Sequence, residues 1–236
     1  MLNSVPTSEV YDELQQAFNH FNGRLFAAAL PPAIITLQRD RKCYGYFSSS
    51  RFVRRTGELA DEIAMNPAHF AAQPIDNTLS TLAHEMVHQW QHHHGKPGRR
   101  GYHNAEWAAR METVGLMPSH TGAVGGKRTG EKMDHYIMGD GPFAVACAEL
   151  VAEPFTVHWL DRVAIVPKVS AELEISPELA ALGIEPAKPG KRIGNRVKFR
   201  CETCRAQAWG KPGLLLLCGT CDGKSLEPVE EGVDVS

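Results

Sequence analysis

The chain has 236 residues, of which 43% are hydrophobic, 22% charged and 8% aromatic, and its formal net charge is -2. This composition is typical of folded globular proteins and argues against disordered, collagen-like and membrane-embedded classes. At about 150 residues per domain, the length predicts one substantial domain and a smaller appendage. The N-terminus has neither a basic start nor an apolar run, and no apolar stretch approaches the ~20 residues that span a bilayer. We therefore expect no signal peptide, no membrane partner and a cytoplasmic location.

Hydrophobic periodicity predicts a mixed α+β chain. Apolar residues spaced three and four apart predict helices, and β-branched or aromatic residues among polar ones predict strands. Six glycines between Pro118 and Pro142 predict a long loop in place of a regular element. In chain order we expect a helix over 7–22 that ends near Asn22 and Gly23, one or two strands over 33–48, a strand over 62–66, helices over 78–94, 105–114 and 143–153, and a strand over 155–166.

The predicted helix over 78–94, with Asp76 or Asn77 as its cap, carries the sequence His84-Glu-Met-Val-His88. Residues four apart lie on one helix face, so both imidazoles can reach one metal ion. Glu85 lies beside them, where a carboxylate can act as general base for hydrolysis. The pattern arises by chance roughly 4 times in 100 in a chain of this composition. The periodic helix around it favours a metal site.

A catalytic zinc needs a third protein ligand and leaves its fourth position open. We expect His103, because it follows the Gly95–Gly101 turn and approaches from a separate element. Glu106, one turn later, is an alternative. Three imidazoles on successive turns would spread over about 12 Å, so we expect His92–His94 to be a solvated helix end. The remaining alternatives for the third ligand are His120 and His135.

Three segments together resemble a known family. Asn19–Pro31 resembles the entry segment of SprT-like (Spartan-like) zinc metalloproteases. The His84–His88 motif and the segment Gly101–Trp107 resemble that family's zinc site in order and approximate spacing. The resemblance covers residues 10–118 and the C-terminal cysteines, and Asn104 departs from the glycine that usually follows the third histidine.

The resemblance implies a zincin-like protease domain, with helices packed on a small sheet, followed by a small zinc ribbon. It implies His84, His88 and His103 as zinc ligands and Glu85 as catalytic base. It also implies action on proteins bound or crosslinked to DNA, and so a role in DNA–protein crosslink repair.

Four cysteines form the pattern Cys201-x2-Cys204-x13-Cys218-x2-Cys221. This paired spacing is typical of a zinc ribbon with a structural zinc, and an iron–sulfur cluster or disulfides are the alternatives. We expect the leucines of 214–217 and Trp209 to form the ribbon's core strands. The two other cysteines, Cys43 and Cys147, are expected to be small buried hydrophobes.

The segment 188–211 carries eight basic residues against one acidic residue, with Phe199 and Trp209 between them. Basic and aromatic residues together suit single-stranded or irregular DNA, although a solvated basic face is the alternative. The candidate nucleic-acid-binding residues are Lys191, Arg192, Arg196, Lys198, Arg200, Arg205, Trp209 and Lys211.

These features predict a metalloprotease domain over 1–187, a basic zinc ribbon over 188–226 and an acidic tail over 227–236. The predicted activity is that of a zinc endopeptidase in which Glu85 activates water, with Tyr136 or His135 as oxyanion donor. A non-enzymatic nucleic-acid-binding regulator with structural metal sites is the alternative, and a hydrolase of small amides is a third reading.

Overall fold

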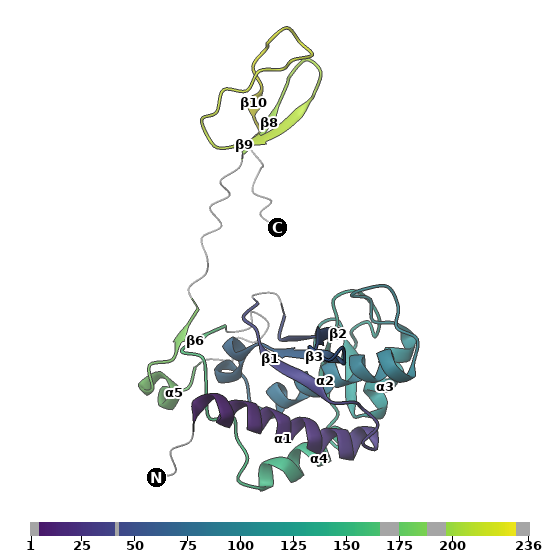
Figure 1. Cartoon of the computed structure of the whole chain (residues 1–236). Coiled ribbons are helices and arrows are strands. Elements are labelled where there is room, and N and C mark those ends of the chain that lie inside the picture. The colour runs from purple at the N-terminus through teal and green to yellow at the C-terminus, as the bar shows by residue number, and fades with distance from the viewer. Residues whose placement is uncertain (1–4, 41–42, 166–174, 188–196, 230–236) are drawn as a thin grey trace. The chain divides into compact units, whose positions relative to one another are not determined.

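The computed structural model describes residues 5–40, 43–165, 175–187 and 197–229 (Figure 1). Its contacts divide the chain into two compact units, residues 1–187 and 188–236. Helices and small sheets occur together along the chain, so the predicted α+β class is confirmed. Within the described residues, no helix is both long and apolar enough to cross a membrane.

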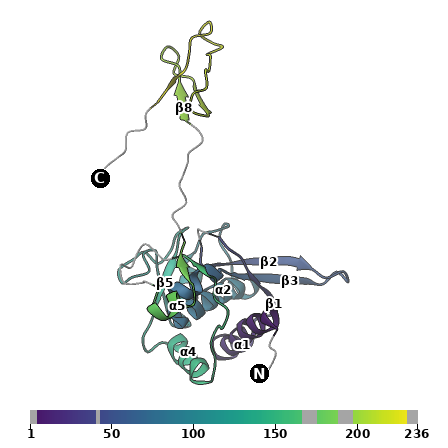
Figure 2. The same cartoon turned by 90° about the vertical axis from the view of Figure 1, so that its left-hand side faces the viewer.

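The first unit is built on a three-stranded sheet with the order β1-β3-β2. Strand β1 (Ala33–Leu37) runs parallel to β3 (Leu59–Met65), and β2 (Gly45–Val53) pairs with β3 in the antiparallel sense. The outer parts of β2 and β3 project as a hairpin (Figure 2). Helix α2 (Ile75–His94) packs on β2 and β3, and α1 (Pro6–Phe26) contacts both α2 and β1. The sheet thus supports the helix that carries the His-Glu-x-x-His sequence.

Helix α1 continues past Gly23 to Phe26, so the predicted end near Asn22 is wrong. A helix can pass through one glycine at a cost of about 1 kcal/mol, and burial of Phe21 and Phe26 favours the longer helix. The Asn22 side chain has another role: it bonds both backbone groups of Leu30, at 3.0 and 3.1 Å. This clamp fixes the path from α1 into β1.

After α2, the chain forms α3 (Ala105–Thr113), β4 (Leu116–Ser119), β5 (Asp134–Ile137) and α4 (Pro142–Ala152). Strands β4 and β5 pair in the antiparallel sense, so the predicted loop over 118–142 is partly wrong. Each strand has only four residues, too few for a clear periodic signal, and most of the glycines lie in the connection between them. The pairing brings β5 back beside the start of α2.

The remaining part of the first unit contains the 3-10 helix η1 (Pro67–Ala72), the short parallel pair β6 (Val163–Ala164) and β7 (Glu185–Pro186), and α5 (Pro177–Ala181). The strand predicted over 155–166 is largely wrong. Phe155 and Val157 alternate because both are buried in the main core, and no neighbouring strand pairs with them within the described residues. Helix α2 also begins earlier than predicted: Pro74 is at its N-cap, in place of Asp76 or Asn77.

The main core of this unit joins its helices to the sheet. Phe21, Leu82, Met86, Trp107 and Phe143 are among its fully buried side chains. Leu82 and Met86 lie on the same α2 face, just before and within the motif, so their burial fixes the segment that carries it. Cys147 is buried in this core as expected, whereas Cys43 is only half-buried.

The second unit contains β8 (Val197–Arg200), β9 (Gln207–Gly210) and β10 (Glu227–Pro228), in the order β10-β8-β9. Its buried core consists of Phe199, Cys201, Cys218 and Leu226. Trp209 is 60% exposed and Leu215 76% exposed, so the prediction that Trp209 and the whole leucine run form this core is wrong. Strand β10 contains the first two residues of the expected acidic tail, and residues 230–236 lie outside the described residues.

Candidate metal centres

Three imidazoles converge beside the middle of α2. His84 and His88 lie one turn apart on α2, and His103 immediately precedes α3. Their ligand atoms all lie within 4.8 Å of one another. The ring centroids of His88 and His103 are 4.8 Å apart, and those of His84 and His88 are 5.2 Å apart. The three predicted histidines therefore form one group that can hold a metal ion.

The surroundings keep these imidazoles uncharged. Burial, with smaller effects from neighbouring histidines, lowers the pKa of His84 well below its usual value. Burial and the nearby His103 lower the pKa of His88 to about 3. Burial also lowers the pKa of His103. Because neutral imidazole is the form that binds metals, the site is ready for a cation at neutral pH.

Backbone contacts fix His103 between two segments of the chain. Its backbone pairs with Gly130 in both directions, at 2.8 and 3.1 Å. Its ring Nδ1 lies 3.1 Å from the same Gly130 carbonyl oxygen, which can only accept. Nδ1 therefore carries the proton, and the Nε2 lone pair remains free for a metal.

Asn104, the departure from the family pattern, has a structural role as the N-cap of α3. Its Oδ1 accepts from the Trp107 backbone N–H at 3.0 Å and from Gln91 at 2.8 Å, and its Nδ2 donates to the Lys96 carbonyl. These three bonds hold the turn that presents His103.

The alternatives for the third ligand have other partners. Glu106 Oε2 accepts from Gln91 and from the Lys96 backbone N–H, at 2.8 and 2.6 Å, and so closes the turn after α2. His120 Nδ1 accepts from the Lys127 backbone N–H at 2.8 Å.

The histidines at the end of α2 are exposed as expected, yet two of them are hydrogen-bonded. His93 Nε2 lies 2.6 Å from the buried Asp61 carboxylate, and His94 Nε2 lies 3.2 Å from the Ala29 carbonyl oxygen. The end of α2 is thereby tied to the sheet and to the segment that precedes β1.

Glu85 lies between α2 and strand β2. It is 6% exposed, and burial raises the pKa of its carboxyl to about 8, opposed by a hydrogen bond from the Phe47 backbone N–H. Gly45 allows this close approach, because a Cβ there would lie 3.3 Å from Glu85 Cγ and 2.8 Å from the Ala64 carbonyl oxygen. Glu85 is thus a buried carboxyl that directly follows His84 on α2.

Two further side chains contact the imidazoles: Trp107, which was not predicted at this site, and His135, which was predicted only as an alternative ligand or an oxyanion donor. Trp107, at 0% exposure, contacts His84, His88 and His103, with ring centroids 5.0, 5.4 and 4.4 Å away. Its position four residues after His103, on the first turn of a predicted helix, was the available signal. His135, on β5, lies 3.1 Å from His84 between their Nδ1 atoms. The sequence separation of 51 residues gave no signal for this contact.

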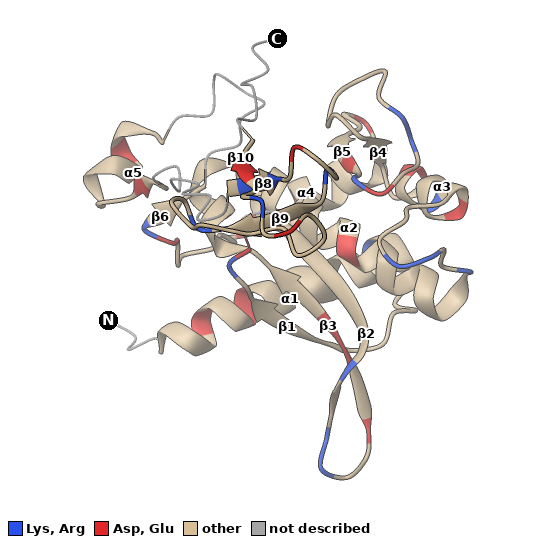
Figure 3. Cartoon of the chain, turned by 90° about the horizontal axis from the view of Figure 1, so that it is seen from above, with Lys and Arg blue, Asp and Glu red and all other residues tan. Residues whose placement is uncertain are grey.

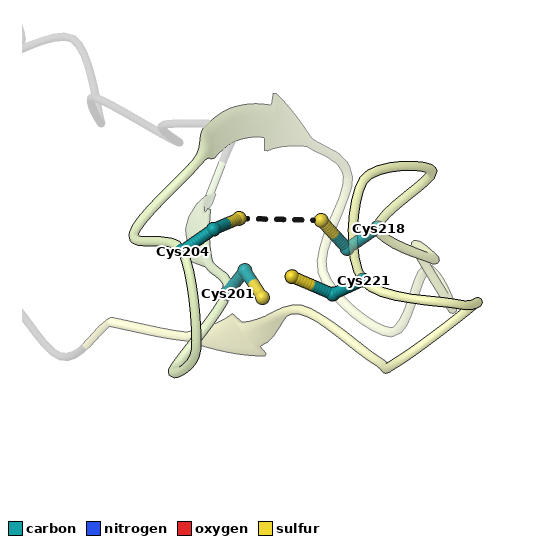
Figure 4. Close-up of side chains that lie close together, drawn as sticks. All are labelled: Cys201, Cys204, Cys218 and Cys221. Atoms are coloured by element: carbon teal, nitrogen blue, oxygen red, sulfur yellow. Dashed lines mark hydrogen bonds between the residues drawn. The ribbon is translucent and has the colours of Figure 1, made fainter.

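The four cysteines of the second unit form another group, drawn in Figure 4, with all Sγ atoms within 4.8 Å of one another. Cys204 Sγ and Cys218 Sγ lie 3.4 Å apart, far longer than a disulfide of about 2.05 Å and close to the about 3.8 Å expected between sulfurs around a tetrahedral zinc. Backbone N–H groups of Cys204 and Thr203 stabilise the Cys201 thiolate and lower its pKa to about 6. This set of donors fits a single metal ion.

Two comparisons with known proteins found matches. The sequence profile of the SprT-like family matches residues 14–125, a range that includes all three histidines and Glu85. An uncharacterized protein in the mucB 3' region of Salmonella typhimurium is 54% identical over 61 residues, which are 25% of this chain and 82% of that protein. The chain belongs to the SprT-like family. No solved structure matches it significantly.

The SprT-like match ends before the second unit, whose surface combines basic and aromatic side chains. Lys198 and Trp209 are cross-strand partners on β8 and β9, and the Lys198 Nζ lies 5.7 Å from the indole centroid. Phe199 is 2% exposed and so cannot stack on a base as predicted. Arg200, Arg205 and Lys211 are also exposed on this unit. The other candidates, Lys191, Arg192 and Arg196, lie outside the described residues.

Basic residues also occur at the end of the β2–β3 hairpin (Figure 3). Arg54 pairs with Glu58 at 2.8 Å, and Arg51 lies 3.9 Å from the buried Glu62. These acidic neighbours offset part of the positive charge of the hairpin.

A third group of potential ligands, Glu9, Glu13 and His158, was not predicted. His158 Nδ1 lies 2.5 Å from Glu13, whose carboxylate also accepts from the His158 backbone, and Trp159 Nε1 donates to Glu9 at 2.6 Å. These bonds attach the 155–160 segment to α1, which is a sufficient structural explanation for the group.

Proposed function

We propose that this protein is a zinc-dependent endopeptidase. The observation that carries the proposal is the convergence of His84, His88 and His103, together with the buried Glu85 that follows His84 on α2. Three neutral imidazoles form a donor set that suits zinc and leaves room for a fourth, exchangeable ligand. Membership of the SprT-like family adds independent support.

Zinc bound by these histidines would polarise the scissile carbonyl group and make water more acidic. Glu85 accepts a proton from the attacking water and transfers it to the leaving nitrogen of the peptide. A nearby cation favours the carboxylate form, so the raised pKa of Glu85 falls when the site is loaded. The hydrogen bond from the Phe47 backbone holds the carboxyl group in place for this role.

The position of β2 supports a polypeptide substrate over a small amide. This strand lies at the edge of the β1-β3-β2 sheet and passes beside Glu85 through Gly45 and Phe47. An edge strand can pair with an extended peptide through main-chain hydrogen bonds. A protein substrate would then lie along the sheet edge, close to the catalytic carboxyl group.

The test compares wild type with Glu85→Gln in cleavage of an unstructured protein, with zinc measured in both. We expect the variant to retain zinc and its fold and to lose at least 100-fold in cleavage rate, as expected when a general base is removed. Glu58→Gln, an exposed position on the β2–β3 hairpin, is the matched control and should cleave normally. Undiminished cleavage by Glu85→Gln would contradict the proposal.

We also propose that the substrates are proteins bound or crosslinked to DNA, and that the second unit binds the DNA. The exposed indole of Trp209 beside Lys198 supports this, because an aromatic face and a cation together suit an unpaired base and its phosphate. We expect salt-sensitive binding of single-stranded DNA that weakens in Trp209→Ala, and cleavage that DNA stimulates. Trp159→Ala, an exposed tryptophan of the first unit, is the control. Equal DNA binding by Trp209→Ala would contradict this role.

We further propose that the four cysteines hold a structural zinc, which gives two zinc ions per chain. The four-sulfur geometry and the small core of the second unit support this assignment. If the histidine site held its metal with four protein ligands and showed no cleavage, the alternative of a non-enzymatic nucleic-acid-binding regulator would be favoured. Paired cysteine ligands suit a reducing compartment, and we propose the cytoplasm as the site of action.

A further inference from the structure

A continuous chain of hydrogen bonds leads from the backbone of α2 to His84 through β5. Ser80 Oγ donates to the Asn77 carbonyl oxygen at 2.9 Å. His135 Nε2 lies 2.9 Å from the same Ser80 Oγ, and His135 Nδ1 lies 3.1 Å from His84 Nδ1. Ser80 and His84 both lie on α2, so His135 bridges two successive turns of the helix that carries the metal-binding motif.

The direction of every bond in this chain follows from the first bond, between Ser80 and Asn77. A carbonyl oxygen only accepts, so the Ser80 hydroxyl uses its single proton toward Asn77. Ser80 Oγ must then accept from His135, which places a proton on His135 Nε2. A neutral imidazole carries one proton, so His135 Nδ1 is an acceptor. His84 Nδ1 must therefore be the donor in the contact between the two rings.

This order leaves the Nε2 lone pair of His84 free for a metal ion. We propose that His135 is a positioning residue that fixes the tautomer and the ring orientation of His84. The inference rests on the metal site of the proposed function, and it assigns to β5 a role in that site. Partners of this kind, which bond the second nitrogen of a metal-binding histidine, typically contribute 10- to 100-fold to metal affinity.

The surroundings of His135 agree with this role. Its side chain is 7% exposed, and among the described residues no carboxylate lies within hydrogen-bond distance of its ring nitrogens, which suits an uncharged ring. Asp134 Oδ1 lies 3.9 Å from His135 Nδ1, beyond hydrogen-bond distance, and accepts from the His135 backbone N–H instead. Of the described residues, only His84 is hydrogen-bonded to that Nδ1.

The ring of His103 is held in the same way as the ring of His84, by an acceptor at Nδ1. The Gly130 carbonyl oxygen accepts from His103 Nδ1 and leaves Nε2 free. Two of the three imidazoles thus have Nδ1 bonded to an acceptor from the segment 130–135, and their Nε2 atoms would be the ones to bind a metal ion. His135 and Gly130 both lie beyond the residues 14–125 that the family profile matches.

The experiment measures the zinc affinity of the full chain by competition with a chromophoric chelator. His84→Ala first identifies which of the two zinc-binding steps belongs to the histidine site. If His84→Ala removes no step, the metal site of the proposed function fails. If it removes one, that step is then followed in the variants of His135.

Two substitutions of similar size separate hydrogen bonding from packing. In His135→Asn, Oδ1 occupies the position of Nδ1 and can accept from His84, whereas in His135→Gln the polar atoms lie near Nε2 and the acceptor is lost. We expect His135→Ala and His135→Gln to bind zinc 10- to 100-fold more weakly, and His135→Asn to remain within about threefold of wild type. His20→Gln, a half-buried histidine bonded to the Ala146 carbonyl oxygen, is the control and should match wild type.

Thermal unfolding of the metal-free proteins shows whether each variant is folded. Ser80→Ala keeps His135 but removes the acceptor that fixes its proton, so it tests the same chain if the His135 variants do not fold. We expect Ser80→Ala to weaken zinc binding severalfold. Wild-type affinity in His135→Ala, or equal affinity in His135→Asn and His135→Gln, would overturn the proposal while leaving the metal site intact. Should only Ser80→Ala fold, unchanged zinc affinity in that variant would also overturn it.

Discussion

The indole ring of Trp107 stacks on the imidazole of His88, with ring centroids 5.4 Å apart and ring planes at 22°. The same indole contacts His84 and His103 at their ring edges. One fully buried side chain from α3 therefore sets the positions of three candidate ligands from two elements. The packing of α3 against α2 therefore also determines how the three histidines are arranged.

Replacement of Trp107 should test this coupling. Trp107→Ala leaves a large cavity, and we expect a loss of about 3–5 kcal/mol in the free energy of unfolding. Trp107→Phe should cost less, since a ring is retained and Trp107 Nε1 has no hydrogen-bond partner to lose within the described residues. Urea denaturation measures stability, and chelator competition measures zinc affinity. Unchanged zinc affinity in a folded Trp107→Ala protein would show that the packing of Trp107 does not determine the geometry of the histidine site.

The metal-free protein should lose stability in acid through its buried histidines. Burial lowers the pKa of His88 to about 3, against about 6.5 in an unfolded chain. Between these values the unfolded state binds more protons than the folded state, so the free energy of unfolding falls as pH drops from about 6.5 toward about 3. The stabilisation is fully present above pH 6.5. Urea denaturation followed by helical circular dichroism measures this fall, because all helices of the described chain belong to the first unit.

His88→Gln should flatten that pH dependence, since it removes one titrating group from the folded core. His92→Gln, at an exposed position on the same helix, should leave the slope unchanged. Equal slopes in wild type and His88→Gln would show that other groups cause the acid sensitivity.

The sequence predicted those parts of the molecule that depend on local periodicity and short spacing. The spacing of apolar residues predicted helix α2, and the four-residue separation of His84 and His88 predicted that both face one site. The paired spacing of the four cysteines predicted their cluster. The sequence named His135 only as an alternative ligand or an oxyanion donor, and its bond to His84 was missed because that bond depends on the pairing of β4 with β5. Those strands are four residues long, and a glycine-rich segment separates them.

The exposed leucines of the second unit show a second limit of prediction from sequence, which concerns the size of a core. A run of apolar residues normally predicts a core strand, but Cys201 and Cys218 already occupy much of the buried centre of this small unit. Leu216 packs against that centre, and Leu215 faces outward. Composition alone could not indicate how few side chains such a unit can bury.

Asn104 provides a test of the turn that presents His103. Asn104→Ala removes a helix N-cap and two further bonds, and we expect a loss of about 1–2 kcal/mol in the free energy of unfolding together with weaker zinc binding. Asn104→Asp keeps the acceptor for Trp107 and Gln91, so it should be milder. If both variants bind zinc as wild type does, the cap does not position His103.

The two units should respond independently to loss of the cysteine site. Cys204→Ser removes one of four thiolate ligands, and structural zinc contributes about 10–16 kcal/mol to the folding of such small modules. We therefore expect the variant to lose one zinc ion, the ordered environment of Trp209 and salt-sensitive DNA binding. The helical circular dichroism and the thermal midpoint of the first unit should stay unchanged, because the three histidines lie in the first unit and the four cysteines in the second. Cys43→Ser, outside the cysteine group, is the control. A fall in the thermal midpoint of the first unit in Cys204→Ser alone would instead show that the second unit stabilises the unit that carries His84, His88 and His103.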